Sequence, residues 1–223
     1  MATLTLVFDL DGTLVDTAPD LIDSLNVLFA RHGLSAVGFD QARNLIGGGV
    51  KQLIERGLAL QDRACAAETV DGMFDEYVAY YAEHIADRSR PFPGLAGALD
   101  RLAHHRLAVC TNKLEWLSTR LIAALGLTPR FAAICGRDTF GMQKPDPEVL
   151  RRTVQAAGGE LAAAVMIGDS ATDIMTARGA GIPVIAVDFG YTEVPVAELK
   201  PDRIIGHFDA LPAAVRDLFP GSI

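Results

Sequence analysis

Residues 7–16 read Val-Phe-Asp-Leu-Asp-Gly-Thr-Leu-Val-Asp, and they overlap an apolar run, Leu4–Phe8, with the length and composition of a buried strand. Asp9 and Asp11 come at the end of this run, and alternate residues of an extended chain point to the same side. Gly12 then lets the chain turn. Two carboxylates at this point are typical of the ligand site of an open α/β sheet. Their mutual repulsion favours a bound cation, and their oxygen ligands suit Mg²⁺.

Two other interpretations of this stretch have to be weighed. An Asp-x-Asp-Gly sequence is often a turn whose carboxylates are solvated. It also has a superficial likeness to a calcium-binding loop, which needs an oxygen ligand at its fifth position and glycine at its sixth. Counted from Asp9, the glycine already comes at the fourth position, as Gly12. The calcium loop is therefore excluded.

Composition narrows the class of protein. The chain has 223 residues, half of them hydrophobic, and a formal net charge of −8. This length suits one large domain or a core with a smaller insert. The negative charge argues against a nucleic-acid or membrane partner. Neither a secretion signal nor an apolar run long enough for a membrane span is expected, so the predicted location is cytoplasmic.

Cysteines and histidines indicate no metal or disulfide site. The three cysteines, Cys65, Cys110 and Cys135, are odd in number and far apart. They are predicted to be reduced thiols of a cytosolic protein. The five histidines lack the spacing of a zinc site.

Residues 16–88 show helical periodicity and no strand pattern. A helix is predicted to begin after Thr17, with Thr17 as its cap and Asp20 completing a capping box. Further helices are predicted over 40–46, from about residue 50, and over about 66–85. A proline-rich linker over 88–94 follows.

Beyond this linker, helices and strands alternate. Strands are predicted over 107–110, 132–135, 165–168 and 184–187, and helices over 95–105, 115–125, 147–157 and 172–179. This alternation predicts an α/β fold, a Rossmann-like doubly wound parallel sheet with a small all-helical cap inserted after the first strand. The discontinuous core would comprise 1–15 and 89–223, and the cap 16–88, placed as a lid over Asp9 and Asp11.

Three more polar stretches follow strands of the predicted sheet. Thr111 and Asn112 end one strand, where a hydroxyl and an amide could bind phosphate, although such residues are also common in turns. Lys144 precedes a helix, where a solvated lysine is the ordinary alternative. Asp169 ends a strand and Asp173 follows one helical turn later, and acidic residues are favoured at helix N-termini anyway.

Together the four stretches resemble, in order, the four motifs of the haloacid dehalogenase-like superfamily. The resemblance implies that Asp9 is a nucleophile that becomes an aspartyl-phosphate. It implies that Asp11 protonates the leaving alcohol and later deprotonates water. It also implies that Mg²⁺ is held by the carboxylate of Asp9, the backbone carbonyl of Asp11, and Asp169.

The resemblance assigns the remaining motif residues to the phosphoryl group and its surroundings. Thr111, Asn112 and Lys144 are expected to bind phosphate. Asp173 is expected to support the metal site or to orient Lys144. The chemistry suits these residue types, because fixed positive charge stabilises the equatorial oxygens of a transferring phosphoryl group.

Several other stretches are similar to those of the bacterial phosphoglycolate phosphatases within this superfamily. They are 16–20, 47–49 with 55–56, 90–94, 189–191 and 200–202. The similarity implies hydrolysis of 2-phosphoglycolate to glycolate and phosphate. Where that family often has asparagine, this chain has Thr172, which is expected to cap the next helix instead.

Alternative functions remain open. The chain could be a phosphatase for another small phosphate ester, or a sugar phosphomutase, which shares all four motifs. A dehalogenase is disfavoured by Asp11, and a non-catalytic interaction module by the intact motifs. The expected partner is a small-molecule phosphate ester, and the expected state is a monomer or homodimer.

The predicted cap has one unusual feature, Gly47-Gly48-Gly49, which runs into a helix near Val50. Helix N-termini bind anions, and glycines permit close backbone approach. Lys51 and Arg56 add positive charge nearby. This turn is predicted to meet the carboxylate of the substrate. The alternative is a flexible turn between two helices.

Overall fold

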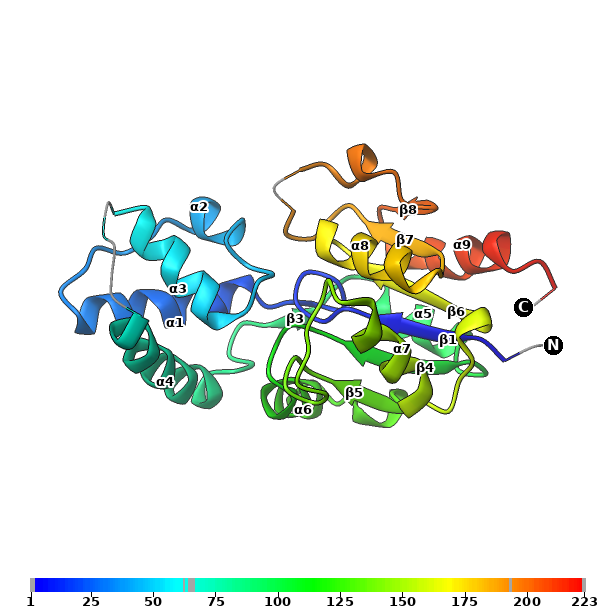
Figure 1. Cartoon of the computed structure of the whole chain (residues 1–223), viewed down its shortest axis with the longest axis horizontal. Coiled ribbons are helices and arrows are strands. Elements are labelled where there is room, and N and C mark those ends of the chain that lie inside the picture. Colours follow the sequence, from blue (N-terminus) through cyan, green and yellow to red (C-terminus); the bar gives the residue numbers. More distant parts are fainter. Residues whose placement is uncertain (1–2, 62, 64–66, 193, 222–223) are drawn as a thin grey trace.

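The computed structural model describes residues 3–61, 63, 67–192 and 194–221. Figure 1 shows a block of helices beside a larger block built on a parallel sheet, with the central strand β1 pointing toward the helices. Both termini lie at the far end of the larger block. The carboxyl end of the sheet therefore faces the helical block.

The sheet has six strands, all parallel, in the order β5-β4-β1-β6-β7-β8. They are β1 (Thr5–Phe8), β4 (Arg106–Cys110), β5 (Ala133–Cys135), β6 (Ala164–Gly168), β7 (Val184–Val187) and β8 (Arg203–Ile205). The chain first adds strands on one side of β1 and then crosses to β6 on its other side. Ligands of open α/β sheets bind at such a reversal of strand order.

Both faces of the sheet are covered, so its strands are apolar on both sides. Leu6 and Phe8 pack into one cluster with α5 (Leu95–Arg101), α6 (Glu115–Ala124) and α9 (Leu211–Leu218). Val7 belongs to a second cluster on the opposite face, with α7 (Pro147–Ala156) and α8 (Ala171–Ala180). The predicted fold class, a doubly wound parallel sheet with a helical insertion, is confirmed.

The helices α1 (Ala18–Arg31), α2 (Phe39–Arg43), α3 (Val50–Ala59) and α4 (Ala67–Glu83) form the insertion, called the cap below. Its centre is aromatic: Phe29, Tyr77 and Tyr81 are fully buried, and the Tyr77 hydroxyl donates to the Leu21 carbonyl at 2.9 Å. The exact division at residues 15/16 and 88/89 stays a prediction.

The two chain crossings between cap and sheet pair with each other. β2 (Val15–Asp16) and β3 (Arg90–Pro91) form a short antiparallel ladder. The expectation of no strand within 16–88 is therefore wrong at Asp16. The pairing ties both crossings side by side.

The predicted capping box at the start of α1 is also wrong. Thr17 occupies the N-cap position, but its hydroxyl donates to Asp11 Oδ1 at 2.8 Å. Asp20 accepts from the backbone N–H of Arg88 and Ser89, at 2.9 and 2.7 Å, and from the Ser89 hydroxyl. Other partners thus replace the local cap, and the hydrogen bonds of Asp20 fasten the two crossings together.

Thr172 does not cap α8, contrary to expectation, because the helix begins one residue earlier. The cap is Ser170, whose hydroxyl accepts from the Asp173 N–H while Asp173 Oδ2 accepts from the Ser170 N–H, a reciprocal capping box. Asp173 therefore has a structural partner within its own turn.

The structure bears on the predictions of reduced cysteines and of no membrane span. Cys110 and Cys135 are buried free thiols, and burial raises the pKa of Cys110 to about 12. Cys65 lies outside the described residues. Among the helices that the structure describes, none has the length and apolar character to cross a membrane.

Candidate active site

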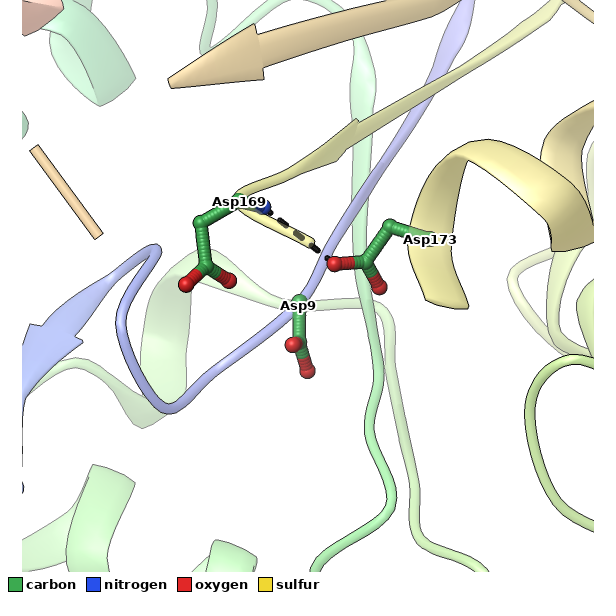
Figure 2. Close-up of side chains that lie close together, drawn as sticks. All are labelled: Asp9, Asp169 and Asp173. Atoms are coloured by element: carbon green, nitrogen blue, oxygen red, sulfur yellow. Dashed lines mark hydrogen bonds between the residues drawn. The ribbon is translucent and has the colours of Figure 1, made fainter. Parts of the chain in front are cut away.

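Three carboxylates meet at the carboxyl end of the sheet (Figure 2). Asp9 directly follows β1, Asp169 directly follows β6, and Asp173 lies in the first turn of α8. One oxygen of each lies within 4.8 Å of the others, and all three residues are buried. Because β1 and β6 are adjacent parallel strands, their ends place Asp9 beside Asp169.

Asp169 is held from two sides. Its Oδ1 accepts from the Thr13 hydroxyl at 3.0 Å, and its Oδ2 accepts from the Tyr191 N–H at 2.6 Å. Gly12 is required where it packs on this carboxylate. Its φ is +83°, and a Cβ there would lie 2.5 Å from Asp169 Oδ2. The turn after Asp11 thus packs its backbone directly against the Asp169 carboxylate.

Lys144 lies between two of the carboxylates. Its ammonium is 2.9 Å from Asp9 Oδ1 and 2.6 Å from Asp173 Oδ1, and the residue is buried. Burial alone would lower the pKa of Lys144, but Asp173 and Asp9 raise it well above its usual value. The two carboxylates therefore favour the charged form of Lys144 beside Asp9.

Asp173 has both oxygens engaged. Oδ1 pairs with Lys144, and Oδ2 accepts from the N–H groups of Asp169 and Ser170 at 3.2 and 3.1 Å. Of the two roles expected for Asp173, this arrangement favours orienting Lys144, and support of the metal site stays a prediction.

The charge balance suits a divalent cation. Burial is the largest cause that raises the pKa of Asp9 to about 6, with Lys144 opposing and Asp173 adding to the rise. Burial, followed by Asp173 and Asp9, raises the pKa of Asp169 to about 8. One lysine does not neutralise three buried carboxylates. Asp9 and Asp169, whose oxygens have the fewest permanent partners, could hold the metal.

Asp11 turns toward a residue that the sequence did not single out. The Lys113 ammonium lies 3.1 Å from both oxygens of Asp11, and Thr17 donates to the same carboxylate. Lys113 is buried and also lies over the Tyr81 ring of the cap, 4.6 Å from its centroid. Its position directly after Thr111 and Asn112 could have marked Lys113 as a site residue. Its partner Asp11, however, is remote in the sequence.

Asn112 serves Lys144 in this geometry. Its Oδ1 accepts from the Lys144 N–H at 2.9 Å, and its amide donates to the Lys144 carbonyl at 3.1 Å. Phosphate binding by the Asn112 side chain stays a prediction, and the contacts favour a positioning role. Thr111 is buried beside it and faces the cavity described next.

A cavity of about 280 Å³ lies between the cap and these residues. Asp9, Asp11, Thr111 and Lys113 contribute to it from the sheet side, and Leu21, Ile46, Gly47, Gly49, Val50, Lys51, Leu53 and Phe74 from the cap. The predicted turn thus reaches the cavity through Gly47 and Gly49, whereas Gly48 is not among the lining residues. Lys51 lines the cavity, but its ammonium pairs with Asp71 at 2.5 Å.

Residues 189–191 of the core, called the strap below, contact the cap close to Asp169. The Arg43 guanidinium of α2 donates to the carbonyls of Phe189 and Gly190, at 3.0 and 3.3 Å, and lies over the Tyr191 ring. The Tyr191 hydroxyl accepts from the Ala18 N–H at 2.9 Å and donates to Asp16. The 189–191 stretch was notable in the sequence, but nothing there indicated a contact with Arg43.

Comparison with known proteins gives consistent matches. The family profile described as "Haloacid dehalogenase-like hydrolase" matches residues 6–187. A phosphoglycolate phosphatase of Mesorhizobium japonicum is 50% identical over 213 residues, covering 95% of this chain and 94% of the relative. One from Caulobacter vibrioides is 45% identical over 212 residues, covering 94% and 90%. The crystal structure of a predicted phosphoglycolate phosphatase from Haemophilus somnus superposes with a TM-score of 0.87 at 26% identity, covering 95% and 97%.

Proposed function

The chain belongs to the haloacid dehalogenase-like hydrolases, and from this premise we propose that it is a Mg²⁺-dependent phosphatase acting on 2-phosphoglycolate. The products would be glycolate and inorganic phosphate. The observation that carries the proposal is the single cavity onto which Asp9, Asp11 and Thr111 open, with Lys144 paired to Asp9 behind it.

Asp9 is the proposed nucleophile. One carboxylate oxygen attacks phosphorus while the alcohol oxygen of glycolate leaves, so that an aspartyl-phosphate forms on Asp9. Asp11 gives its proton to the leaving oxygen and then takes a proton from the water that attacks the aspartyl-phosphate. Phosphate departs and both aspartates return to their starting states.

The neighbouring residues stabilise the charge on the phosphoryl group. The Thr111 hydroxyl donates to an equatorial oxygen, and Lys144 supplies a fixed positive charge, held by Asp173 and Asn112. Mg²⁺, held by Asp9, Asp169 and the Asp11 carbonyl, would neutralise further charge on the same oxygens.

The choice of 2-phosphoglycolate rests on the named relatives and on the cap. The glycines of the 47–49 turn, of which Gly47 and Gly49 line the cavity, lead into α3, whose N-terminal amides suit an anion. Gly49 has a φ of +87°, a conformation that favours glycine. This turn is proposed to meet the carboxylate end of the substrate, with Lys51 adding positive charge on the same wall of the cavity.

Hydrolysis of a panel of phosphate esters tests the proposal. Inorganic phosphate release would be measured from 2-phosphoglycolate, ethyl phosphate and hexose phosphates, with Mg²⁺ or with EDTA. We expect Mg²⁺-dependent release, with kcat/KM for 2-phosphoglycolate at least about tenfold above the others, a difference of about 1.4 kcal/mol. Asp9→Asn should lower the rate by more than about a hundredfold, beyond the loss of a helper group.

The outcomes separate the alternatives. Interconversion of hexose phosphates without phosphate release would indicate a mutase. Preference for another ester would change the substrate alone. No turnover of any ester would contradict an enzymatic function. Full activity in EDTA would contradict the proposed requirement for Mg²⁺.

A further inference from the structure

Among the described residues that line the cavity, Arg137 is the cation without an acidic partner. The cationic side chains that line the cavity are Lys51, Lys113 and Arg137. Lys51 is paired with Asp71, and Lys113 with both oxygens of Asp11. Within the described part of the chain, the Arg137 guanidinium has no carboxylate within ion-pairing distance.

The backbone that carries Arg137 is fixed at the end of β5. Its N–H donates to the Lys113 carbonyl at 3.1 Å, which joins it to the stretch after Thr111. The next residue, Asp138, accepts from the Glu115 N–H at 2.8 Å. Gly136 before it donates to the Thr139 hydroxyl at 2.8 Å. The loop is therefore preorganised, and the Arg137 guanidinium extends from a rigid base.

The guanidinium reaches the cap at the predicted anion-binding turn. A Cβ built on Gly49 would lie 2.8 Å from Arg137 Nη1. Arg137 thus lies across the junction of core and cap, next to the first residues of α3. Its positive charge and the N-terminal amides of α3 border the same cavity as Asp9.

We propose that Arg137 determines specificity by binding the carboxylate of the substrate while the phosphoryl group is held at Asp9. This inference rests on the proposed function and identifies the substrate class as short phosphate esters of 2-hydroxy acids. A guanidinium offers two parallel donors that match a carboxylate. In a protein of net charge −8, local positive charge favours binding of a substrate with two anionic ends.

The other cations suit this role less well. Withdrawing Lys113 would leave Asp11 without its ion pair, and Lys51 has a half-exposed side chain with its own acidic partner. Arg137 can bind a carboxylate without breaking an ion pair to any residue that the structure describes. Esters that lack the carboxylate gain nothing from it.

The test compares two substrates of nearly the same shape, 2-phosphoglycolate and ethyl phosphate, in the full-length enzyme with Mg²⁺. For Arg137→Gln we expect kcat/KM on 2-phosphoglycolate to fall about 10- to 100-fold, mostly through KM. The kcat/KM for ethyl phosphate should fall much less, by about twofold. Arg137→Lys should recover part of the loss. Arg120→Gln, at an exposed position on α6, is the matched control and should resemble wild type.

Each result has a distinct meaning. If Arg137→Gln lowers kcat/KM for both substrates equally, or leaves the preference for 2-phosphoglycolate intact, Arg137 does not bind the carboxylate. The proposed function stands in either case. If wild type does not favour 2-phosphoglycolate over ethyl phosphate, the proposed substrate itself is wrong and the role of Arg137 falls with it.

Discussion

Asp11 illustrates how a single carboxylate is prepared by residues far from it in the sequence. It is a partly buried side chain whose oxygens are held by Lys113 and Thr17, at the edge of the cavity. Asp9, in contrast, faces Lys144 and Asp169 in the interior. Two aspartates one residue apart thus have different partners, as their proposed roles as acid–base and nucleophile require.

Replacing Asp11 by asparagine separates proton transfer from the rest of the reaction. Asp11→Asn should slow 2-phosphoglycolate hydrolysis by about 10²- to 10⁴-fold, the usual contribution of a general acid. The loss on p-nitrophenyl phosphate should be under about tenfold, because its leaving group needs no proton. Kinetics on both substrates, with thermal unfolding as a check on the uncompensated Lys113, measure this. Equal losses would mean that Asp11 acts through structure.

At the residue scale, strand patterns correctly placed Asp9 and Asp169 together at the carboxyl end of the sheet, while the roles of both residues stay predictions. A carboxylate after an apolar strand has a position fixed by the sheet, whatever the rest of the chain does. The contacts of Lys113 and Arg137 could not be predicted from the sequence, because they depend on distant groups, Asp11 in one case and the cap in the other. Local periodicity contains no information about such contacts.

At the element scale, the ends of helices were the least predictable feature. Thr17 and Asp20 have the sequence of a capping box, yet both bond to residues brought in by the fold. The same side-chain chemistry was available, and tertiary partners competed successfully for it. The strands were predicted more closely because an apolar run buried on both faces has few alternative structures.

The contact between Arg43 of α2 and the strap, residues 189–191, gives a prediction at the scale of elements. Arg43→Ala removes the hydrogen bonds to Phe189 and Gly190 and the contact with the Tyr191 ring. Because Tyr191 also bonds Asp169, the cap and the proposed metal site should loosen together. We expect kcat/KM to fall about fivefold or more, roughly 1 kcal/mol, on 2-phosphoglycolate and ethyl phosphate alike.

The matched control for this strap is Arg120→Ala, which removes an exposed arginine from α6. Arg43→Lys should restore part of the activity, because an ammonium can still donate to a carbonyl and lie over the ring. A loss confined to 2-phosphoglycolate would contradict the strap. It would place Arg43 on the substrate carboxylate instead.

At the scale of the whole molecule, the fold concentrates negative charge where two blocks meet. The sheet delivers Asp9 and Asp169 to its carboxyl end, and the cap covers that end (Figure 1). Burial of like charges destabilises the metal-free protein, whereas a bound cation would reverse the effect. Catalysis and stability are therefore linked through the same carboxylates.

This linkage gives a pH-dependent prediction with a definite sign. In the metal-free protein, burial raises the pKa of Asp9 to about 6 and of Asp169 to about 8, both above the usual 3.8. Between pH 4 and 8 the folded state then holds more protons than the unfolded state. The contribution of these groups to stability is full below about pH 4 and is lost as the pH rises to 8. Mg²⁺ competes with those protons, so its stabilisation should grow over the same range.

Thermal unfolding at pH 6 and pH 8, with EDTA or with Mg²⁺, measures the effect. The rise in Tm caused by Mg²⁺ should be larger at pH 8, by roughly 2–4 °C for each kcal/mol of linked stability. Asp169→Asn keeps the shape of the side chain and removes one charge, so it should raise the Tm of the metal-free protein at pH 8 and abolish the response to Mg²⁺. Asp75→Asn, at an exposed position on α4, should behave as wild type. A Mg²⁺ response that is equal at both pH values, or that survives Asp169→Asn, would mean that the cation binds away from this cluster.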